Sequence, residues 1–458
     1  MTGSVDHSRQ DSKDDRSSSQ NSLRQIARNS GWLMAGKIFG ALASIVYLAL
    51  AARFLQPEGF GTFVLIVGIA QLFAGVVGVQ SWQIIVRFGA LHLGRGDAGG
   101  ARLLIHWCLL LEIAGAAGAC ILAVVCLQIA APVFDWTDAI AGNATVFAIF
   151  ILVCIRSTPM GVLRLDNRFA ASAMADAMMP ATRLIGAVIA VATGPTVASM
   201  LIAWAASEAA SALTYWLFAA KGWTRGAPAP GLQAIMAAPD TNPELVRFAV
   251  TTNALKAFTS FQQQLPLLAI GAVAGAAVVG QFRLAHQLGQ SLRLISELIG
   301  RAAFAELAHA QARLAGEGPG EEGKAVERKH PEALHRGIGR AALVAAAVMA
   351  GLAIIVGYPA LLLIGGPAYV SAYPLLVLVA LAASIDLAAV GYEPFLLARG
   401  RGDLALYVRA ASVLALVAGL FTLLPLLGAT GGATAIVIAS VAALLLGNRA
   451  VAKEARAK

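Results

Sequence analysis

Long apolar stretches separated by short polar breaks recur along the whole chain. A helix needs about 20 mostly apolar residues to cross a bilayer, and this rule predicts about twelve membrane helices. Their predicted ranges are 30–53, 60–87, 102–129, 140–160, 171–193, 197–220, 245–270, 276–304, 338–358, 373–397, 404–427 and 430–450. The pattern therefore predicts an all-α integral membrane protein.

The second half of the chain repeats features of the first half at a constant distance. With Gly61 aligned on Gly280, the offset is 280 − 61 = 219 residues, and five further positions carry the same residue type. These pairs are Lys37 with Lys256, Phe39 with Phe258, Phe63 with Phe282, Leu65 with Leu284, and Gln71 with Gln290. Because Lys and Gln are rare inside apolar spans, we interpret the matches as two similar halves that begin near Asn29 and Pro243.

Polar segments divide the chain into five parts. Residues 1–28 are rich in Ser, Asp, Arg and Gln, and we expect a disordered cytoplasmic tail there. A cytoplasmic linker, 221–243, joins an N-terminal six-helix lobe, 29–220, to a C-terminal six-helix lobe, 244–452, and residues 453–458 form a second cytoplasmic tail. No connection is long enough to fold as a separate catalytic domain.

Composition supports a membrane protein, and the distribution of charge predicts its orientation. The chain is 58% hydrophobic and 13% charged, whereas soluble domains carry about 25% charged residues. The net charge of +9 does not indicate nucleic-acid binding, because the basic residues cluster at the ends of apolar spans. Alternate connections are basic, and Arg53 is the one basic residue on the other side. Since positive residues stay in the cytoplasm, both termini are predicted to be cytoplasmic.

The sequence offers no motif of an enzyme, a cofactor site or a metal site. It contains no G-x-x-x-x-G-K-[ST] loop, and the short turns at 94–97 and 400–403 do not follow strands. No His pair has metal-ligand spacing, and the four Cys residues lie inside apolar spans, where they are expected to be small buried side chains. We therefore expect no enzyme activity, no cofactor and no metal.

Polar residues inside the spans are the remaining candidates for function, because charge at membrane depth tends to face a bundle interior or a watery cavity. They suggest a cationic cavity for an anionic head group such as a diphosphate, formed by Lys37, Arg87, Lys256, Arg283 and Arg293. Amide side chains expected to line the same cavity are Gln71, Gln80, Asn253, Gln263 and Gln290. The alternative is structural, namely hydrogen bonds between helices and basic residues near the membrane surface.

Two embedded acids are candidates for binding a coupling ion. Glu208 lies in the middle of a span and has no obvious local partner in the sequence. Glu297 lies one helical turn from Arg293, so an ion pair between the two is its structural explanation.

Four short segments resemble the polysaccharide exporters of the multidrug/oligosaccharidyl-lipid/polysaccharide (MATE-like) flippase superfamily. Residues 50–63, LAARFLQPEGFGTF, resemble the L-A-R-x-L-G-P-x-x-[FY]-G signature of the first outer turn. Residues 279–285, 365–372 and 428–435 resemble later motifs of the family in the expected order. The resemblance implies two pseudo-symmetric six-helix lobes around a central cavity. It also implies transport of a polyprenyl-diphosphate-linked oligosaccharide from the cytoplasmic to the periplasmic leaflet of a bacterial inner membrane.

The chain departs from the family pattern at two places, and other functions stay open. Gln262-Gln263-Gln264 stands where these exporters often carry an Asp, and Gln56 replaces the usual Gly of the first turn. The alternatives are a drug or peptidoglycan-precursor exporter, a membrane polymerase, and a scaffold of a polysaccharide assembly complex. Expected partners are the lipid-linked oligosaccharide, the bilayer and polysaccharide polymerase or assembly proteins.

Overall fold

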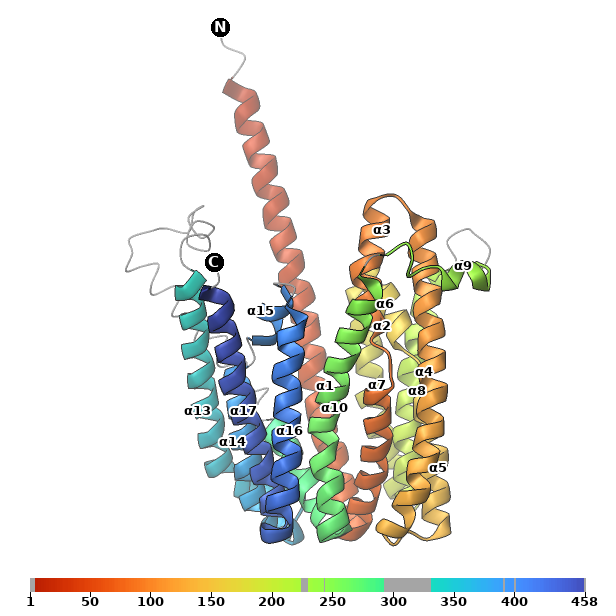
Figure 1. Cartoon of the computed structure of the whole chain (residues 1–458), viewed down its shortest axis with the longest axis vertical. Helices are drawn as coiled ribbons and strands as arrows, with labels where there is room; N and C mark the ends of the chain where they lie inside the picture. The colour runs from red at the N-terminus through yellow and green to blue at the C-terminus, as the bar shows by residue number, and fades with distance from the viewer. Residues whose placement is uncertain are drawn as a thin grey trace.

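The protein is a bundle of long helices that lie side by side (Figure 1). The computed structural model describes residues 5–223, 230–242, 244–291, 331–389, 392–398 and 401–456, and these residues form helices, turns and bends but no strand. The predicted all-α fold is confirmed for this part of the chain. The first helix begins and the last helix ends at the same end of the bundle, as Figure 1 shows.

The helices follow one another in chain order. The first half contains α1 (Val5–Val76), α2 (Ser81–Ile84), the π-helical segment η1 (Ile85–Gly89), α3 (Ala90–Gly94), α4 (Ala98–Val133), α5 (Asp138–Val153), α6 (Ser157–Leu165), α7 (Phe169–Thr193) and α8 (Val197–Trp223). The predicted linker contains the short helix α9 (Leu232–Met236). The second half contains α10 (Leu245–Ala274), a helix over 276–291, α13 (Pro331–Ile364), the 3-10 segment η2 (Pro367–Ala372), α14 (Tyr373–Ala389), α15 (Tyr392–Ala398), α16 (Gly402–Leu427) and α17 (Ala429–Arg456).

Nine helical stretches of the described residues are long and apolar enough to cross a membrane, so the chain is a multi-pass membrane protein. The first stretch, Phe39–Gly94, has 56 residues and contains the chain reversal at Gln56, so it is long enough for two passes. Helix α10 is not among the nine, since it carries Asn253, Lys256 and three consecutive Gln residues. The predicted span 276–304 lies partly outside the described residues. The count of twelve therefore stays a prediction.

The beginning of α1 differs from the prediction of a disordered tail over residues 1–28. The described helix starts at Val5 and projects beyond the bundle in Figure 1. Starting a new helix is unfavourable, whereas adding residues to an existing helix is easy. A membrane helix that is already formed therefore favours continuation of the helix into this polar segment.

The predicted break at residues 56–59 is present as a sharp reversal within α1. Gln56 adopts φ 60° and ψ 167°, a backbone conformation that is disfavoured for every residue except Gly. The Gly that the family motif carries at this position would adopt it without strain. The replacement of Gly by Gln56 is therefore a strained feature of this chain.

We expect the substitution Gln56→Gly to stabilise the protein by about 1 kcal/mol, because strain of this kind costs on the order of 1–3 kcal/mol and Gly adds back some unfolded-state entropy. The thermal unfolding midpoint of the purified protein in detergent measures the effect. The control is Gln128→Gly, at an exposed position inside α4, where Gly is expected to lower the midpoint. A midpoint of Gln56→Gly at or below that of the wild type would contradict the prediction.

The two halves meet at the end of the bundle that carries the Gln56 reversal, in a contact that repeats the internal symmetry. A Cβ atom on Gly61 would lie 1.7 Å from the backbone oxygen of Ala276, and one on Gly280 would lie 2.7 Å from the backbone oxygen of Pro57. The offset of 219 residues relates position 61 to position 280, both Gly, and Pro57 to Ala276. Each half therefore presents the same Gly to the same position of the other half.

A similar Gly–Ala contact occurs in each half. A Cβ atom on Gly186 of α7 would lie 2.8 Å from the Cβ of Ala203 in α8. One on Gly419 of α16 would lie 2.9 Å from the Cβ of Ala435 in α17. The helix pairs α7–α8 and α16–α17 thus pack through matching Gly–Ala contacts, as membrane helices often do because small residues let backbones approach closely.

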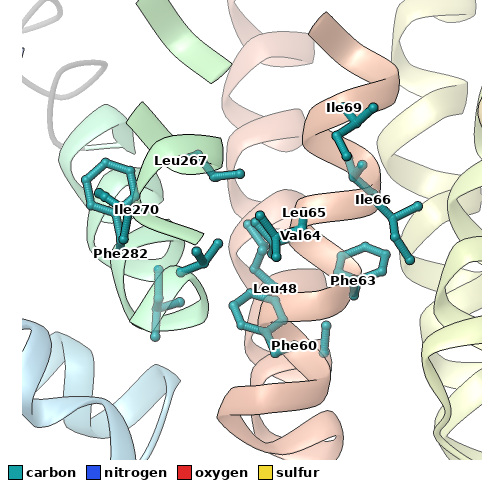
Figure 2. Packing of buried hydrophobic residues seen from close by; sticks show 14 of the residues in the cluster. Leu48, Phe60, Phe63, Val64, Leu65, Ile66, Ile69, Leu267, Ile270 and Phe282 are labelled. Carbon is teal, nitrogen blue, oxygen red and sulfur yellow. The ribbon is translucent and has the colours of Figure 1, made fainter. Parts of the chain in front are cut away.

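The second segment of α1 packs along α10, so the halves are in contact over much of their length. Gly61, Gly68 and Gly75 recur every seven residues, and the last two lie against Leu267 and Ser260 of α10. In Figure 2, Leu267 and Ile270 lie beside the stretch of α1 that carries Phe60 to Ile69. These residues belong to one buried cluster with members from both halves.

A group of hydrogen bonds joins the α3–α4 turn to the end of the linker. His92 Nδ1 lies 2.8 Å from Asp97 Oδ2, and His92 Nε2 lies 2.9 Å from Asn242 Oδ1. Asp97 Oδ1 accepts a hydrogen bond of 2.8 Å from the backbone N–H of Gly100 and so caps the N-terminus of α4. This hydrogen bond, followed by the one with His92, lowers the pKa of Asp97.

We expect Asp97→Ala to destabilise the protein by about 1 kcal/mol, the usual effect of losing an N-cap. Because the pKa of Asp97 is lowered on folding, its contribution is present above its unfolded pKa and is lost as the pH falls through the lowered value. The difference in thermal midpoint between wild type and variant should therefore be full at neutral pH and shrink in acid. Asp138→Ala, at an exposed position in the first turn of α5, is the control. An Asp97→Ala effect that grows on acidification would contradict the assignment.

Candidate functional site

A polar cavity of about 410 Å³ lies among the first-half helices and α10. Its polar lining residues are Gln71, Gln80, Glu112, Arg156, Ser157, Glu208, Lys256, Ser260, Gln263 and Gln264. The last four belong to α10, and the others come from the first half. The cavity is therefore built mainly by one half of the molecule and completed by a single helix of the other.

An interruption of the second predicted span forms one wall of the cavity. Helix α1 ends at Val76 and α2 begins at Ser81, so the predicted continuous helix over 60–87 is wrong in this region. Side chains accept the backbone hydrogen bonds at this break. The N–H of Gln80 donates to Asn253 Oδ1 at 2.7 Å, and the N–H of Trp82 donates to Ser157 Oγ at 3.1 Å. Irregular backbone at membrane depth is tolerated where side chains satisfy it and it lines a cavity.

A charged cluster surrounds Glu208 on α8. Arg156 Nη1 donates to Glu208 Oε2, while Arg183 Nη2 donates to Glu208 Oε1 at 3.1 Å. Trp204 Nε1 donates to the same Oε1 at 3.2 Å, and the Arg183 guanidinium carbon lies 3.6 Å from the centre of the Trp204 ring. Two guanidinium groups thus share one carboxylate, which leaves the cluster with a net positive charge.

Lys256 adds a second positive charge to the cavity. Among the described residues no hydrogen-bond or ion-pair partner of its ammonium group is found, and Arg156 is close enough to repel it. Arg156, Arg183 and Lys256 therefore outnumber the two acids of the cavity wall, Glu112 and Glu208. Charges interact more strongly in a partly dry site than in water, so this cavity favours an anionic ligand.

Several predicted site residues do line the cavity. Gln71, Gln80, Gln263 and Lys256 lie on its wall, and Asn253 lies at its edge as the partner of the Gln80 backbone. Gln71 also accepts a hydrogen bond of 3.1 Å from Gln264 Nε2. Their proposed role in binding stays a prediction.

Glu208 lines the cavity, but the expectation that it lacks a partner is wrong. Its partners Arg156 and Arg183 come from other segments of the chain, which the local sequence around Glu208 does not reveal. With both oxygens occupied by guanidinium groups, the carboxylate has a structural explanation. A role in ion coupling stays a prediction.

Arg87 does not lie in the cavity lining, contrary to the expectation. Its side chain is 49% exposed, forms an ion pair of 3.5 Å with Glu244 and lies over the Phe248 ring. The reason is local, because Arg87 lies in the π-helical segment η1, beyond the break at 77–80, and these irregularities change the direction of its side chain.

The remaining predicted residues lie elsewhere. Arg283 does not line the main cavity but a smaller space on the other side of Gln71 and Gln264. Gln290 is half-buried and is not part of the lining. Arg293, Glu297 and the side chain of Lys37 lie outside the described residues.

Sequence reasoning missed two basic residues of the site. Arg156 falls inside the predicted span 140–160, near its end. Arg183 lies in the middle of the predicted span 171–193. An Arg inside one span and a Glu inside the next are a recognisable signal, since such residues pair at membrane depth.

Comparisons with known proteins agree with this architecture. A family model described as "Polysaccharide biosynthesis protein" matches residues 26–304. The inner membrane protein YghQ of Escherichia coli (strain K12) is 26% identical over 286 residues, which are 62% of this chain and 81% of YghQ.

Two solved structures share the fold. An inward-facing multidrug resistance MATE family transporter of the MOP superfamily matches with a TM-score of 0.62 and 16% identity, over 90% of this chain and 95% of that one. The lipid II flippase MurJ in an inward closed conformation matches with a TM-score of 0.65 and 11% identity, over 92% of this chain and 87% of that one. The expected resemblance in fold is therefore confirmed.

Proposed function

Because this chain belongs to the polysaccharide biosynthesis protein family, we propose that it flips a polyprenyl-diphosphate-linked oligosaccharide from the cytoplasmic to the periplasmic leaflet of a bacterial inner membrane. The similarity to YghQ supports this membrane, and the MATE- and MurJ-like fold supports transport rather than catalysis. The proposal assigns both termini to the cytoplasm, as the distribution of basic residues predicts.

The observation that carries the proposal is the unpaired charge of Lys256 beside Arg156 in the 410 Å³ cavity. A diphosphate that is esterified at both ends bears a negative charge and acceptor oxygens on each phosphate, and both Lys and Arg bind such groups. The amide groups of Gln71, Gln80 and Gln263 on the same wall are suited to hydrogen bonds with sugar hydroxyls. The polyprenyl tail stays in lipid while the head group occupies the cavity.

The proposed transport step is a rocking of the two halves, and contacts at the end with the Gln56 reversal support it. Arg53 Nε donates to the backbone oxygen of Ile364 at 3.1 Å, and Tyr369 Oη donates to that of Ala52 at 3.1 Å. Both bonds join the first half to the second. Arg53, the exception to the charge rule, interacts here with the last carbonyl groups of α13, which carry partial negative charge. These bonds hold the predicted periplasmic end closed and must break for release.

The experiment that tests the function is a leaflet assay in the native host. The gene is deleted, polyprenyl-diphosphate-linked oligosaccharides are extracted, and their orientation in the inner membrane is measured. We expect accumulation in the cytoplasmic leaflet, reversed by the wild-type gene. Normal delivery to the periplasmic leaflet in the deletion strain, with polymer still missing, would reject flipping in favour of a polymerase or scaffold.

A further inference from the structure

A second acid of the cavity wall has no charged partner. Glu112 on α4 is 6% exposed, and its Oε2 accepts a hydrogen bond of 3.3 Å from the backbone N–H of Thr158. Its other oxygen, Oε1, is buried without a hydrogen-bond partner, and so is the hydroxyl oxygen of Thr158. Two neighbouring residues thus each leave one polar atom unsatisfied at the same place.

The groups around Glu112 in the described structure are neutral hydrogen-bond donors, and no cation balances its charge. The hydroxyl-bearing residues Ser81, Ser157 and Thr158 lie around it, from the start of α2 and the start of α6. Cys108, one turn earlier on α4, is its titratable neighbour, and Arg156, Lys256 and Glu208 face the same cavity. Arg156 is engaged by Glu208, and no ion pair joins Glu112 to any described residue.

A proton satisfies both unpaired atoms. Burying an unpaired charge is much more costly than burying a neutral group, and a protonated carboxyl group gains an O–H donor. The Thr158 side chain lies within hydrogen-bonding reach of Glu112, and its hydroxyl oxygen, which has no other partner, is an acceptor for that donor. A metal ion is a poorer occupant, because no group of three or more His, Cys, Asp or Glu residues with metal-binding geometry occurs in the described part of the chain.

We propose that Glu112 is a proton-binding site of the cavity, occupied in the conformation described here. When the halves rock and water enters from the other side, hydration stabilises the carboxylate and the proton leaves from Oε1 to water. Uptake from one side and release to the other couples proton movement to the transport cycle. This coupling rests on the proposed function, whereas the proton site itself does not.

Infrared spectroscopy of the full-length protein in lipid vesicles tests the site without any substrate. A protonated carboxyl group has a carbonyl band that is separate from those of carboxylates and shifts in heavy water. We expect this band at pH 7 in the wild type, and its loss in Glu112→Gln. The control Glu244→Gln removes an exposed carboxylate paired with Arg87 and should leave the band unchanged. Survival of the full band in Glu112→Gln would overturn the proposal.

Two further measurements keep the proposal testable if Glu112→Gln does not fold. Thr158→Val removes the hydroxyl group but keeps the backbone N–H, so we expect the band to remain and to move. In the wild type, addition of sodium chloride in place of choline chloride should leave the band unchanged. Disappearance of the band with sodium would overturn the proton site in favour of a sodium site, and an unmoved band in Thr158→Val would reject the assigned partner.

A transport measurement separates this proposal from the proposed function. In vesicles that contain the lipid-linked oligosaccharide, we expect an imposed pH gradient to change the flipping rate of wild type but not of Glu112→Gln. If the band is assigned to Glu112 but no lipid is flipped by the wild type, the proton site stands and the proposed function fails. If lipid is flipped at a rate that ignores the pH gradient, the coupling is wrong and the flippase function stands.

Discussion

Replacing Lys256 with Gln is expected to reduce flipping by about 10- to 100-fold at unchanged protein abundance. A hydrogen bond to a charged group contributes roughly 1.5–3 kcal/mol, which corresponds to that range of binding constants. Lys256 lines the cavity without an ion-pair partner among the described residues, so its charge is available to a diphosphate. The rate of lipid flipping in vesicles, measured at several lipid concentrations, checks the prediction.

The matched control for this variant is Arg247→Gln on the same helix. Arg247 is exposed and does not line the cavity, so the control removes one positive charge from α10 without changing the site. Because Lys256 carries an unpaired charge near Arg156, its removal should leave the thermal midpoint unchanged or raise it. Wild-type flipping by Lys256→Gln would show that the cavity charge does not bind the substrate.

Placing a methyl group on Gly61 is expected to destabilise the protein by about 3 kcal/mol, at the upper end of the usual effect of overpacking. The new Cβ would lie 1.7 Å from the backbone oxygen of Ala276, and a backbone atom has little freedom to move away. The halves must then separate at this end, which removes the closed state and slows transport. Thermal unfolding in detergent and the flipping rate of Gly61→Ala measure the two effects.

Two further Gly→Ala variants test whether the loss of stability follows how close the contact is. Gly280→Ala places its Cβ at 2.7 Å from the oxygen of Pro57 and should be less damaging than Gly61→Ala. Gly142→Ala, in α5, meets nothing within 4 Å and should be neutral or slightly stabilising. Equal midpoints for the variants at 61 and 142 would contradict the close contact between the halves.

The internal repeat could be predicted from the sequence because identical residues recur at a constant offset. The alignment of Gly61 with Gly280 rests on residue identity alone, and in the structure each of these residues contacts the repeat-related position of the other half. The reversal near Gln56 was likewise predicted, since Pro57 and Gly59 interrupt an apolar span. Both features can be read from the order of residues along the chain.

The candidate site was predicted less completely, because it depends on residues that are distant in sequence. Arg156 meets Glu208 across 52 positions, and Gln71 meets Gln264 across 193. Helical periodicity suggested Lys256 and Gln263, which lie on one regular helix and line the cavity. It was wrong for Arg87, which follows an irregular segment.

The sequence alone establishes an all-helical membrane protein with two related halves, since span length and repeat spacing are properties of the chain in one dimension. Which charged groups share a cavity is decided only by the packed structure. Each residue turns a helix by about 100°, so the break between Val76 and Ser81 and the π-helical segment after it redirect the side chains that follow in the same span. The pairing of Glu208 and the isolation of Glu112 follow from that packing and have no counterpart in local sequence.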